Sequence, residues 1–344
     1  MTTSVELLDR RQVRPVDRFV LQHPLGTPFH ETRWLDLVRA SFGFETRTLV
    51  AWRDRQVVGV LPLALVTAPI TGRRLVSVPF GVYGGILAAD DEALAGLDHG
   101  SMVLARTINA RYLELRYLGT GPTRHQSVAL HETYRADLPA SPQAVLPAIP
   151  RKARAEVRKA LERCGVRLVE GRGLLDEFYR LYVLNKRSLG SPVFGRRYFR
   201  RLLELYGPRA TLHGVVAEQR VLAAVLSVQA RDVFYPYYSG AQPGADRLGA
   251  NNALYALLME EAVRRGCRVF DFGRSRVGSG AAAFKRHMGF LPAPLDYQFY
   301  FPRGGHPPAI HPGNPAMALP QRLLASLPTW LARLVGPAVM RHVP

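Results

Sequence analysis

Two stretches of the chain share one order of secondary structure. Residues 48–63 and 211–226 each read as an apolar strand, a short polar turn and a second apolar strand. A further apolar or aromatic run follows each stretch, then a helix and a short closing strand. The helices are expected at residues 92–109 and 251–265, and the closing strands at 110–118 and 267–273. This repeated order predicts a duplicated α/β unit, although many α/β proteins share it by chance.

The length of 344 residues, of which 47% are hydrophobic, allows two separate cores. Residues 137–150 are rich in proline and small residues and are expected to link the halves. We therefore expect domains at residues 1–140 and 141–303, followed by a tail at 304–344.

Positive charge is concentrated in one part of the chain. The net charge is +19, and residues 151–209 alone carry 16 basic and 6 acidic residues. Such a patch either faces a polyanionic substrate or is a solvated helical face. Arginine outnumbers lysine heavily, because only Lys152, Lys159, Lys186 and Lys285 are lysines.

Cysteine content and hydropathy indicate a cytoplasmic protein. Cys164 and Cys267 are the only cysteines, too few for a disulfide framework or a cysteine zinc site. The N-terminal segment lacks the apolar core of a signal peptide, and no apolar run is long enough to span a membrane. The expected location is the cytoplasm, with the inner face of the cytoplasmic membrane as the alternative.

The tail begins with a proline- and glycine-rich extended segment and continues as an amphipathic helix over residues 321–336. Leu323, Leu327, Leu331 and Leu334 cluster on it, with Arg322 and Arg333 outside. Docking of this helix on its own protein is the favoured interpretation. The alternative is peripheral membrane contact, because a basic helix with an interfacial Trp330 can lie on anionic lipid.

The loop at residues 240–254 separates a strand from a helix and is rich in glycine. Asn251 is expected to cap the helix, and bare amides at a helix N-terminus beside a cation form an anion site. The candidate residues for a cofactor pyrophosphate or a tRNA phosphate are Arg247, Gly249, Ala250 and Asn251. A plain turn with a capped helix remains the alternative.

Residues 269–290 contain a short buried strand that ends at Asp271, then a Gly-Ser-Gly turn and a helix with Phe284 and Lys285. A cation just after the strand and turn could stabilise the oxyanion of an acyl transfer. A surface lysine is the alternative. Asp271 is a candidate proton acceptor or structural anchor.

The glycine-rich loop at residues 78–87 contains Tyr83 and Gly84, which either line a substrate groove or form a tight turn. Zinc-protease, Walker, nucleophile-elbow and dinucleotide motifs are all missing from the sequence. The histidines show no ligand spacing, so no metal is expected.

Several motifs together resemble Fem-type proteins. They are YPYYSGA at 235–241, RVFDFGRS at 268–275, FKRHMGF at 284–290, RKARAEVRKALERCGV at 151–166, NKRSLGSPVFGRRYF at 185–199 and VPFGVYGGIL at 78–87. They look most like the FemAB-related subgroup associated with exosortase and PEP-CTERM systems. The resemblance covers roughly residues 30–302.

The resemblance implies an α/β (α+β) fold of tandem GNAT-like domains, each with a mixed, mainly antiparallel sheet and flanking helices. In characterised Fem transferases an amino acid passes from aminoacyl-tRNA to an amine of a peptidoglycan precursor. The roles implied here are donor positioning by Phe284, oxyanion stabilisation by Lys285 and phosphate contacts by Arg154 and Arg158. Tyr238 and Arg274 are further candidates for substrate contact.

Two departures leave donor and acceptor open. The stretch at residues 244–250 is not the clean pyrophosphate loop of an acetyl-CoA enzyme, and the exosortase-linked subgroup suggests an exopolysaccharide acceptor. The main hypothesis is direct acyl or aminoacyl transfer to an amine or hydroxyl of a phosphate-bearing glycan or peptidoglycan precursor. The alternatives are an acetyl-CoA-dependent N-acetyltransferase and a non-enzymatic binding protein for tRNA or an anionic polymer. No tightly bound cofactor and no DNA partner is expected.

Overall fold

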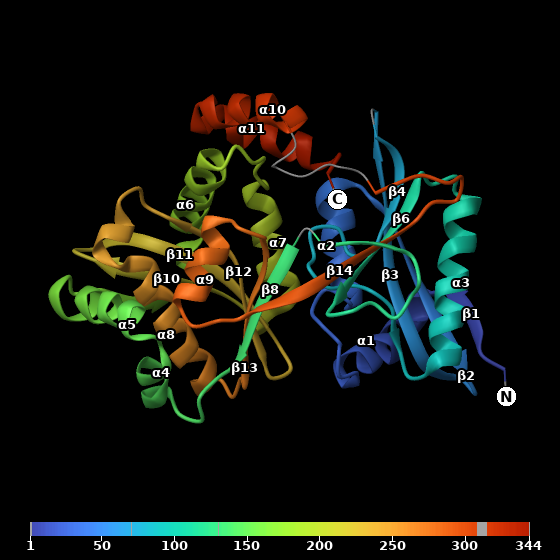
Figure 1. Cartoon of the computed structure of the whole chain (residues 1–344), viewed down its shortest axis with the longest axis horizontal. Coiled ribbons are helices and arrows are strands. Elements are labelled where there is room, and N and C mark those ends of the chain that lie inside the picture. Colours follow the sequence, from blue (N-terminus) through green and yellow to red (C-terminus); the bar gives the residue numbers. More distant parts are fainter. Residues whose placement is uncertain (1, 70, 130, 308–314, 344) are drawn as a thin grey trace. The chain divides into compact units, whose positions relative to one another are not determined.

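The computed structural model describes residues 2–69, 71–129, 131–307 and 315–343, which form two compact units (Figure 1). Unit 1 consists of Met1–Leu130, Pro294–Ala309 and Ala338–Pro344, and unit 2 of His131–Ala293 and Ile310–Pro337. Each unit has a mixed, mostly antiparallel sheet with helices packed on it. The predicted fold class is therefore confirmed.

The sheet of unit 1 has the order β1-β2-β3-β4-β6-β14, with β5 beside β3 and β7 beside β14. All its pairs are antiparallel except β4 with β6. The strands are β1 (Ser4–Leu7), β2 (Glu45–Arg53), β3 (Gln56–Ala68), β4 (Gly72–Val76), β5 (Leu87–Ala88), β6 (Tyr112–Leu118), β7 (Gln126–Val128) and β14 (Pro292–Tyr300). The helices are α1 (Val13–Gln22), α2 (Thr32–Phe42) and α3 (Asp91–Thr107).

Alternating side chains of β2 and β3 divide the core of unit 1 between the two faces of the sheet. Leu49 and Leu61 pack in the cluster with Leu97 of α3. Their neighbours Val50 and Val60 pack on the other face, in the cluster that contains Val16 and Val20 of α1. The sheet therefore lies between α3 and α1.

The sheet of unit 2 has the order β8-β13-β12-β11-β10-β9, antiparallel except for β12 with β13. Its strands are β8 (His131–Asp137), β9 (Arg167–Glu170), β10 (Ala210–Ala217), β11 (Arg220–Ala230), β12 (Val233–Ala241) and β13 (Val269–Arg276). Its helices are α4 (Pro142–Ala148), α5 (Arg151–Arg158), α6 (Leu175–Ser188), α7 (Arg196–Tyr206), α8 (Ala250–Arg264), α9 (Gly280–His287) and α10 (Pro315–Ser326). The last helix, α11 (Thr329–Met340), ends beyond the unit boundary at Pro337.

The two units repeat a detailed local feature as well as an order of elements. The β2–β3 hairpin turns through Asp54 and Arg55, and the β10–β11 hairpin through Glu218 and Gln219, all four with positive φ. Two consecutive residues of this conformation form the tight turn that suits the twist of a hairpin. The register also shifts once in each hairpin, after Ala51 and after Val215. The shared turn and bulge support the predicted duplication.

Each unit contains one strand that lies, along the chain, within the domain predicted for the other. β8 follows β6 and β7 along the chain but pairs with β13 in unit 2. β14 follows β13 and α9 but pairs with β6 and β7 in unit 1. The compact units therefore differ from the predicted domains, because residues 131–140 belong to unit 2 and residues 294–303 to unit 1.

Two predicted segments differ from the structure. The expected linker at residues 137–150 contains α4, which packs on α8. The single tail helix expected at residues 321–336 is two helices, α10 and α11, interrupted before Pro328. Proline lacks an N–H and disfavours helical geometry in the residue before it, so the break occurs there. The extended segment of the tail lies partly outside the described residues, at 308–314.

Candidate functional site

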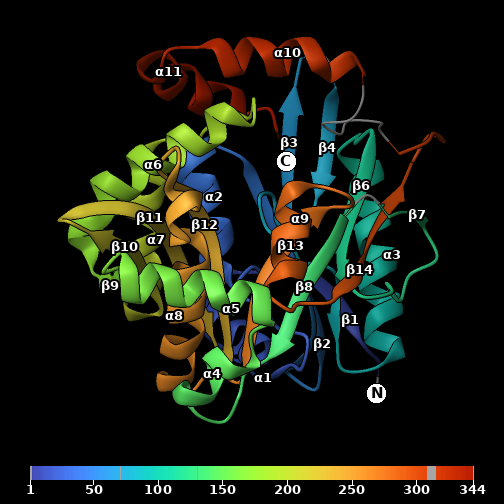
Figure 2. The same cartoon turned by 60° about the vertical axis from the view of Figure 1, so that its left-hand side comes forward.

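The parallel strands β12 and β13 part soon after they begin. Only Val233 with Val269 and Phe234 with Phe270 are paired, in a part of the chain, residues 131–307, that is described throughout. Farther along, β12 stays paired with β11 and β13 with β8. We call the diverging segments, residues 235–241 and 271–276, the fork (Figure 2). Backbone groups on the inner edges of parted strands can pair with an extended ligand.

Lys285 reaches the fork from α9, the helix that follows β13. Its Nζ donates to the carbonyl oxygens of Phe272 at 2.9 Å, Gly273 at 2.8 Å and Arg274 at 3.2 Å. An ammonium group has three N–H donors, so all of them are engaged. Burial lowers the pKa of Lys285 to about 8, and the charges of Asp271 and Glu132 oppose this shift.

The three carbonyls lie on an irregular part of β13. Pairing with β8 shifts register between Asp271 and Arg274, and Gly273 has a φ of 67°. The buried carboxylate of Asp271 accepts a hydrogen bond from the Gly273 N–H at 2.7 Å. Asp271 and Lys285 thus hold the same turn of backbone through its N–H and its carbonyls. This geometry corresponds to the structural-anchor alternative for Asp271.

Phe284, half-buried beside Lys285, packs in the aromatic core of unit 2. Its ring centroid lies 5.5 Å from that of Tyr255 and 6.5 Å from that of Phe272. Phe272 also lies beneath the Lys285 ammonium, 5.7 Å from its ring centroid. The structure therefore brings Phe284, Lys285, Asp271 and Arg274 together around one segment of β13.

Lys186 is a residue of this region that the sequence did not single out. It lies on α6, which crosses β12 closely: Asn185 Nδ2 donates to the Ser239 carbonyl at 3.1 Å, and a Cβ on Gly240 would lie 2.4 Å from the Leu181 backbone. Burial and the charge of Arg274 both lower the pKa of Lys186. Two cations from α6 and β13 therefore lie near each other at the fork. The signal in the sequence that could have identified Lys186 was the scarcity of lysine.

No carboxylate of the described residues lies within ion-pair distance of the Lys186 ammonium. It lies over the ring of Tyr182, with the ring centroid 5.7 Å away. A half-buried cation beside a second cation favours the binding of an anion, because an anion offsets the charge that burial leaves unscreened.

Tyr238 lies in an aromatic cluster under α6 and α7. Its hydroxyl is 2.8 Å from that of Tyr198, and burial raises the pKa of Tyr238 well above the ordinary range. Its ring also contacts Tyr182 and Phe199. Tyr238 thus connects the helices to β12 from inside the core.

The predicted phosphate contacts on α5 have different surroundings. Arg154 is half-buried and donates to the Pro147 carbonyl at 2.7 Å, whereas Arg158 is exposed. Other basic residues near them are also exposed: Arg151, Lys152, Lys159 and Arg163. This part of the charge concentration is a solvent-accessible basic face.

The predicted anion site at the start of α8 lies against α5. A Cβ on Gly249 would lie 2.6 Å from the Glu156 carbonyl, and Lys159 Nζ donates to the Arg247 carbonyl at 3.0 Å. Gly249, with a φ of 67°, is the N-cap, Ala250 is buried and no side chain caps the helix. The expectation that Asn251 caps α8 was therefore wrong, because the helix begins one residue before it.

Tyr83 and Gly84 belong to unit 1, where residues 77–87 are buried throughout. Buried side chains bind successive carbonyls of this loop. Arg116 donates to Val78 and Gly81, Trp34 to Pro79, Tyr297 to Val82 and Thr27 to Tyr83, and His30 Nε2 lies 3.0 Å from the Gly85 carbonyl. Val78 and Phe80 have positive φ values of 42° and 64°, which are strained for such residues. The loop is a tightly held turn.

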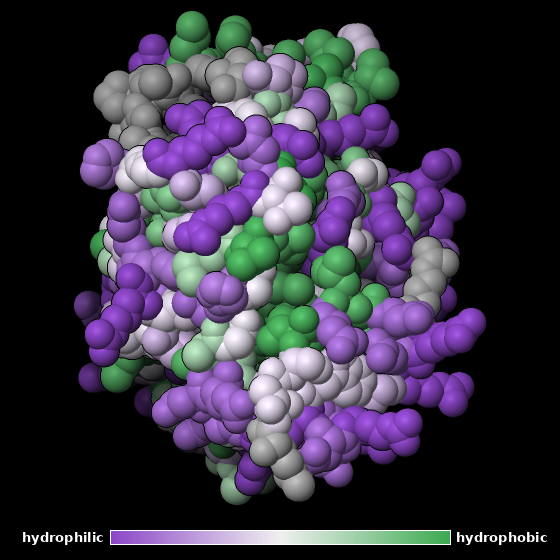
Figure 3. Space-filling model, turned by 90° about the vertical axis from the view of Figure 1, so that its right-hand side faces the viewer, coloured by the Kyte–Doolittle hydropathy of each residue, from purple (hydrophilic) through white to green (hydrophobic). Residues whose placement is uncertain are grey.

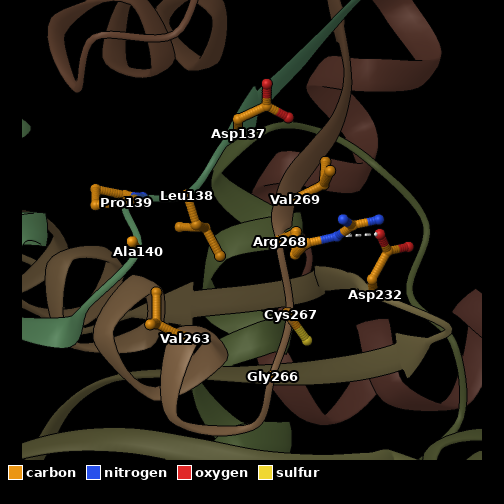
Figure 4. A pocket seen from close by; sticks show the side chains of 10 residues that line it. All are labelled: Asp137, Leu138, Pro139, Ala140, Asp232, Val263, Gly266, Cys267, Arg268 and Val269. Carbon is orange, nitrogen blue, oxygen red and sulfur yellow. Dashed lines mark hydrogen bonds and ion pairs between the residues drawn. The ribbon is translucent and has the colours of Figure 1, made fainter.

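A cavity of about 600 Å³ opens elsewhere in unit 2 (Figure 4). It lies where β12 and β13 begin, at the end opposite the parted segments. Its rim carries the ion pair of Arg268 with Asp232 at 3.1 Å, and burial raises the pKa of the Cys267 thiol to about 11. A thiol that holds its proton so firmly is a poor nucleophile. Lys285, Lys186 and Arg274 lie at the fork and do not line this cavity.

Comparison with known proteins places the fork inside a recognised domain. Residues 150–286 match the family model of an acetyltransferase (GNAT) domain. That range contains Lys186, the parted segments of β12 and β13, and Lys285. No curated protein sequence matches the chain significantly.

Solved structures share the architecture of nearly the whole chain. FemX is 17% identical with a TM-score of 0.66, and the match covers 85% of this chain and 97% of FemX. A tandem GNAT protein from the clavulanic acid biosynthesis pathway is 14% identical with a TM-score of 0.54, over 88% of this chain and 100% of that one. The C-terminal domain of a putative lysylphosphatidylglycerol synthetase from Agrobacterium fabrum is 15% identical with a TM-score of 0.52, over 84% and 92%.

The fold is a tandem GNAT fold. The second GNAT unit contains the fork together with Lys285, Lys186 and Arg274. The first contains the buried loop with Tyr83 and Gly84. In the described residues no group of three or more His, Cys, Asp or Glu side chains could hold a metal ion.

Proposed function

We propose that the protein is an acyl- or aminoacyl-transferase whose donor lies in the fork of the second GNAT unit. The observation that carries this proposal is the parting of β12 and β13 beside Lys186 and Arg274. Parted strand edges offer backbone hydrogen bonds to an extended acyl donor, and the cations suit its phosphates. The proposed donors are acyl-CoA or aminoacyl-tRNA, both of which join an acyl group to a phosphate-bearing carrier.

The proposed acceptor is an amine or hydroxyl of a phosphate-bearing cell-envelope or exopolysaccharide precursor. The likeness to FemX and the exposed basic face around Arg158 support this class of acceptor. A phosphate on the acceptor would bind to that face through charge-assisted hydrogen bonds. The roles of Arg154, Arg158 and Arg247 as phosphate contacts remain part of this proposal.

The proposed transfer is direct. The acceptor nitrogen or oxygen attacks the carbonyl carbon of the donor, the bond from that carbon to sulfur or ribose oxygen breaks, and the leaving atom takes up the proton that the acceptor loses. Positioning and electrostatic stabilisation supply the rate. Lys285 contributes by fixing the β13 carbonyls. It would become an oxyanion donor only by exchanging one of its three carbonyl partners for the substrate.

The donor class can be tested with two labelled donors. The protein is incubated with acetyl-CoA or with aminoacyl-tRNA, each in the presence of amino-sugar and nucleotide-linked precursors, and products are identified by mass spectrometry. Transfer from aminoacyl-tRNA supports the Fem-type function. Transfer from acetyl-CoA supports the second candidate, an N-acetyltransferase, which the GNAT family match favours. Absence of transfer, together with tRNA binding that weakens steeply with salt, would instead indicate a binding protein.

The cations are tested with matched lysine substitutions. Lys186→Met removes the half-buried cation of the fork, and Lys152→Met removes an exposed one from α5. We expect Lys186→Met to raise the KM for the phosphate-bearing donor about tenfold or more and Lys152→Met to leave it nearly unchanged. Equal effects of the two substitutions would contradict an anion site at the fork.

A further inference from the structure

The two C-terminal helices carry large apolar side chains that face solvent. Leu319 and Leu323 of α10 are 66% and 59% exposed, and Trp330 and Leu334 of α11 are 66% and 70% exposed. Each pair is spaced i, i+4, which places its members on one face of their helix. Figure 3 shows apolar atoms among polar ones along its top edge, the level at which Figure 1 shows α10 and α11. We call these four side chains the apolar row.

Other residues of the same helices are docked on unit 2, so the apolar row does not belong to a loose tail. A Cβ on Gly336 would lie 2.5 Å from Val193, and one on Gly190 would lie 2.5 Å from the Gln321 carbonyl. The Arg333 guanidinium lies over the ring of Tyr179 at 5.5 Å. α10 also packs on α6, the helix that carries Lys186. These contacts fix which side of the helices faces solvent.

The charge carried by the C-terminal stretch of chain that forms the two helices has a single sign. Residues 297–344 contain no aspartate or glutamate, and their charged side chains are Arg303, Arg322, Arg333 and Arg341. Arg322, Arg333 and Arg341 are exposed on or next to the two helices. Exposed apolar side chains flanked by arginines match a surface that is apolar below and negatively charged above, as an anionic bilayer is.

We infer that the apolar row binds the surface of an anionic lipid bilayer, with α10 and α11 lying in the plane of the membrane. Trp330 would lie at the headgroup level, where indole rings are favoured, and Arg322 and Arg341 would contact lipid phosphates. Among the described helices, none has both the length and the hydropathy of a membrane span. A bilayer contact of this kind would keep the transferase beside membrane-bound acceptors.

Vesicle co-sedimentation tests the inference on the full chain. The probes are vesicles of pure phosphatidylcholine and vesicles that also contain phosphatidylglycerol, at low and high salt. We expect binding to the anionic vesicles that weakens with salt. The double variant Trp330→Ser/Leu334→Ser should bind at least tenfold more weakly. Leu291→Ser, at a leucine that is 79% exposed elsewhere in unit 2, is the matched control and should bind like the wild type.

Tryptophan fluorescence adds a readout from the apolar row itself. The other two tryptophans are Trp34, which is buried, and Trp52, which is half-buried. A shift to shorter wavelength on adding anionic vesicles that is lost in Trp330→Phe would therefore come from Trp330. Two results with vesicles would overturn the inference: no binding to either kind of vesicle, or equal binding of the double variant and the wild type. A third would be a wild-type protein that does not bind vesicles but self-associates, with the self-association lost in the double variant. The last would mean that a second copy of the chain covers the row. These readouts do not depend on transfer activity.

Discussion

The ammonium nitrogen of Lys285 lies 2.8 Å from the carbonyl oxygen of Gly273, at the point where β13 loses its register with β8. With its bonds to Phe272 and Arg274, this contact ties α9 to the fork. Lys285→Met would leave three carbonyls without this donor. We expect the free energy of unfolding to fall by about 1 to 3 kcal/mol, because buried polar groups that lose their partners are costly. Urea unfolding measures the change, and unaltered stability would contradict a stabilising role for these three hydrogen bonds.

The same lysine predicts a dependence of stability on pH. Its pKa is about 8 in the folded protein against an ordinary value of 10.5, so the unfolded chain binds more protons between these values. Stability contributed by this residue therefore rises with pH from about 8 to 10.5 and is constant below about 8. The difference in unfolding free energy between wild type and Lys285→Met should change in favour of the wild type by up to about 3 kcal/mol over this window. If the difference in unfolding free energy between the two proteins does not vary with pH, the pKa of Lys285 is not lowered in the folded protein.

Arg116 should be essential for unit 1. Its Nε donates to Glu114 at 2.8 Å and its Nη1 to the Gly81 carbonyl at 3.0 Å, and both charged side chains are buried. Arg116→Met leaves the Glu114 carboxylate buried without its cation, at an expected cost of about 3 to 5 kcal/mol. The double variant Glu114→Gln/Arg116→Met should be less destabilised in chemical denaturation. If it is as unstable as the single variant, the ion pair is not the cause.

Gly84 is expected to tolerate no side chain. A Cβ there would lie 2.0 Å from Val78 Cγ2, and Val78 is already held at a φ of 42°. Gly84→Ala should destabilise the protein by about 1 to 3 kcal/mol through overpacking. Gly173→Ala is the control, because a Cβ at Gly173 would meet nothing within 4 Å. The thermal midpoints of the two variants compare them directly, and similar midpoints would mean that the loop can relax.

His213 predicts sensitivity to acid. Burial, with a smaller contribution from the charge of Arg265, lowers its pKa to about 4 from an ordinary value of 6.5. Between these values the unfolded chain binds more protons, so stability falls as pH drops from 6.5 to 4. His213→Phe should remove up to about 3 kcal/mol of this decline. Parallel pH profiles for the two proteins would show that His213 is not responsible.

Local patterns in the sequence predicted much of the fold. The apolar runs joined by polar turns at 48–63 and 211–226 formed the two hairpins with matching turns, because a hairpin depends on residues that are near neighbours in sequence. The exchange of β8 and β14 could not be predicted in this way. Tertiary packing decides which strand pairs with β6 and which with β13. The sequence of a strand does not by itself specify the strand that it pairs with.

The candidate site shows a similar limit. Phe284, Lys285, Asp271 and Arg274 were singled out from one segment, and they do lie together. The hydrogen-bond acceptors of Lys285 are backbone carbonyls, and their position cannot be recognised from residue types in the sequence. Gly240 allows α6 to approach β12 at Leu181, a residue distant from it along the chain, and this close approach helps to place Lys186 near Arg274.

The exchange of final strands has a consequence for how the protein is made. One edge of β6 in unit 1 stays unpaired until β14 has been synthesised, and β14 follows β8–β13 of unit 2 along the chain. Until then β6 presents unpaired backbone groups, the kind of edge at which chains associate wrongly. β8, in contrast, emerges before its partner β13. Neither half can therefore mature by itself during translation. A cut at the predicted boundary would give two fragments that each lack a strand, and co-expression of the fragments would be needed to restore both sheets.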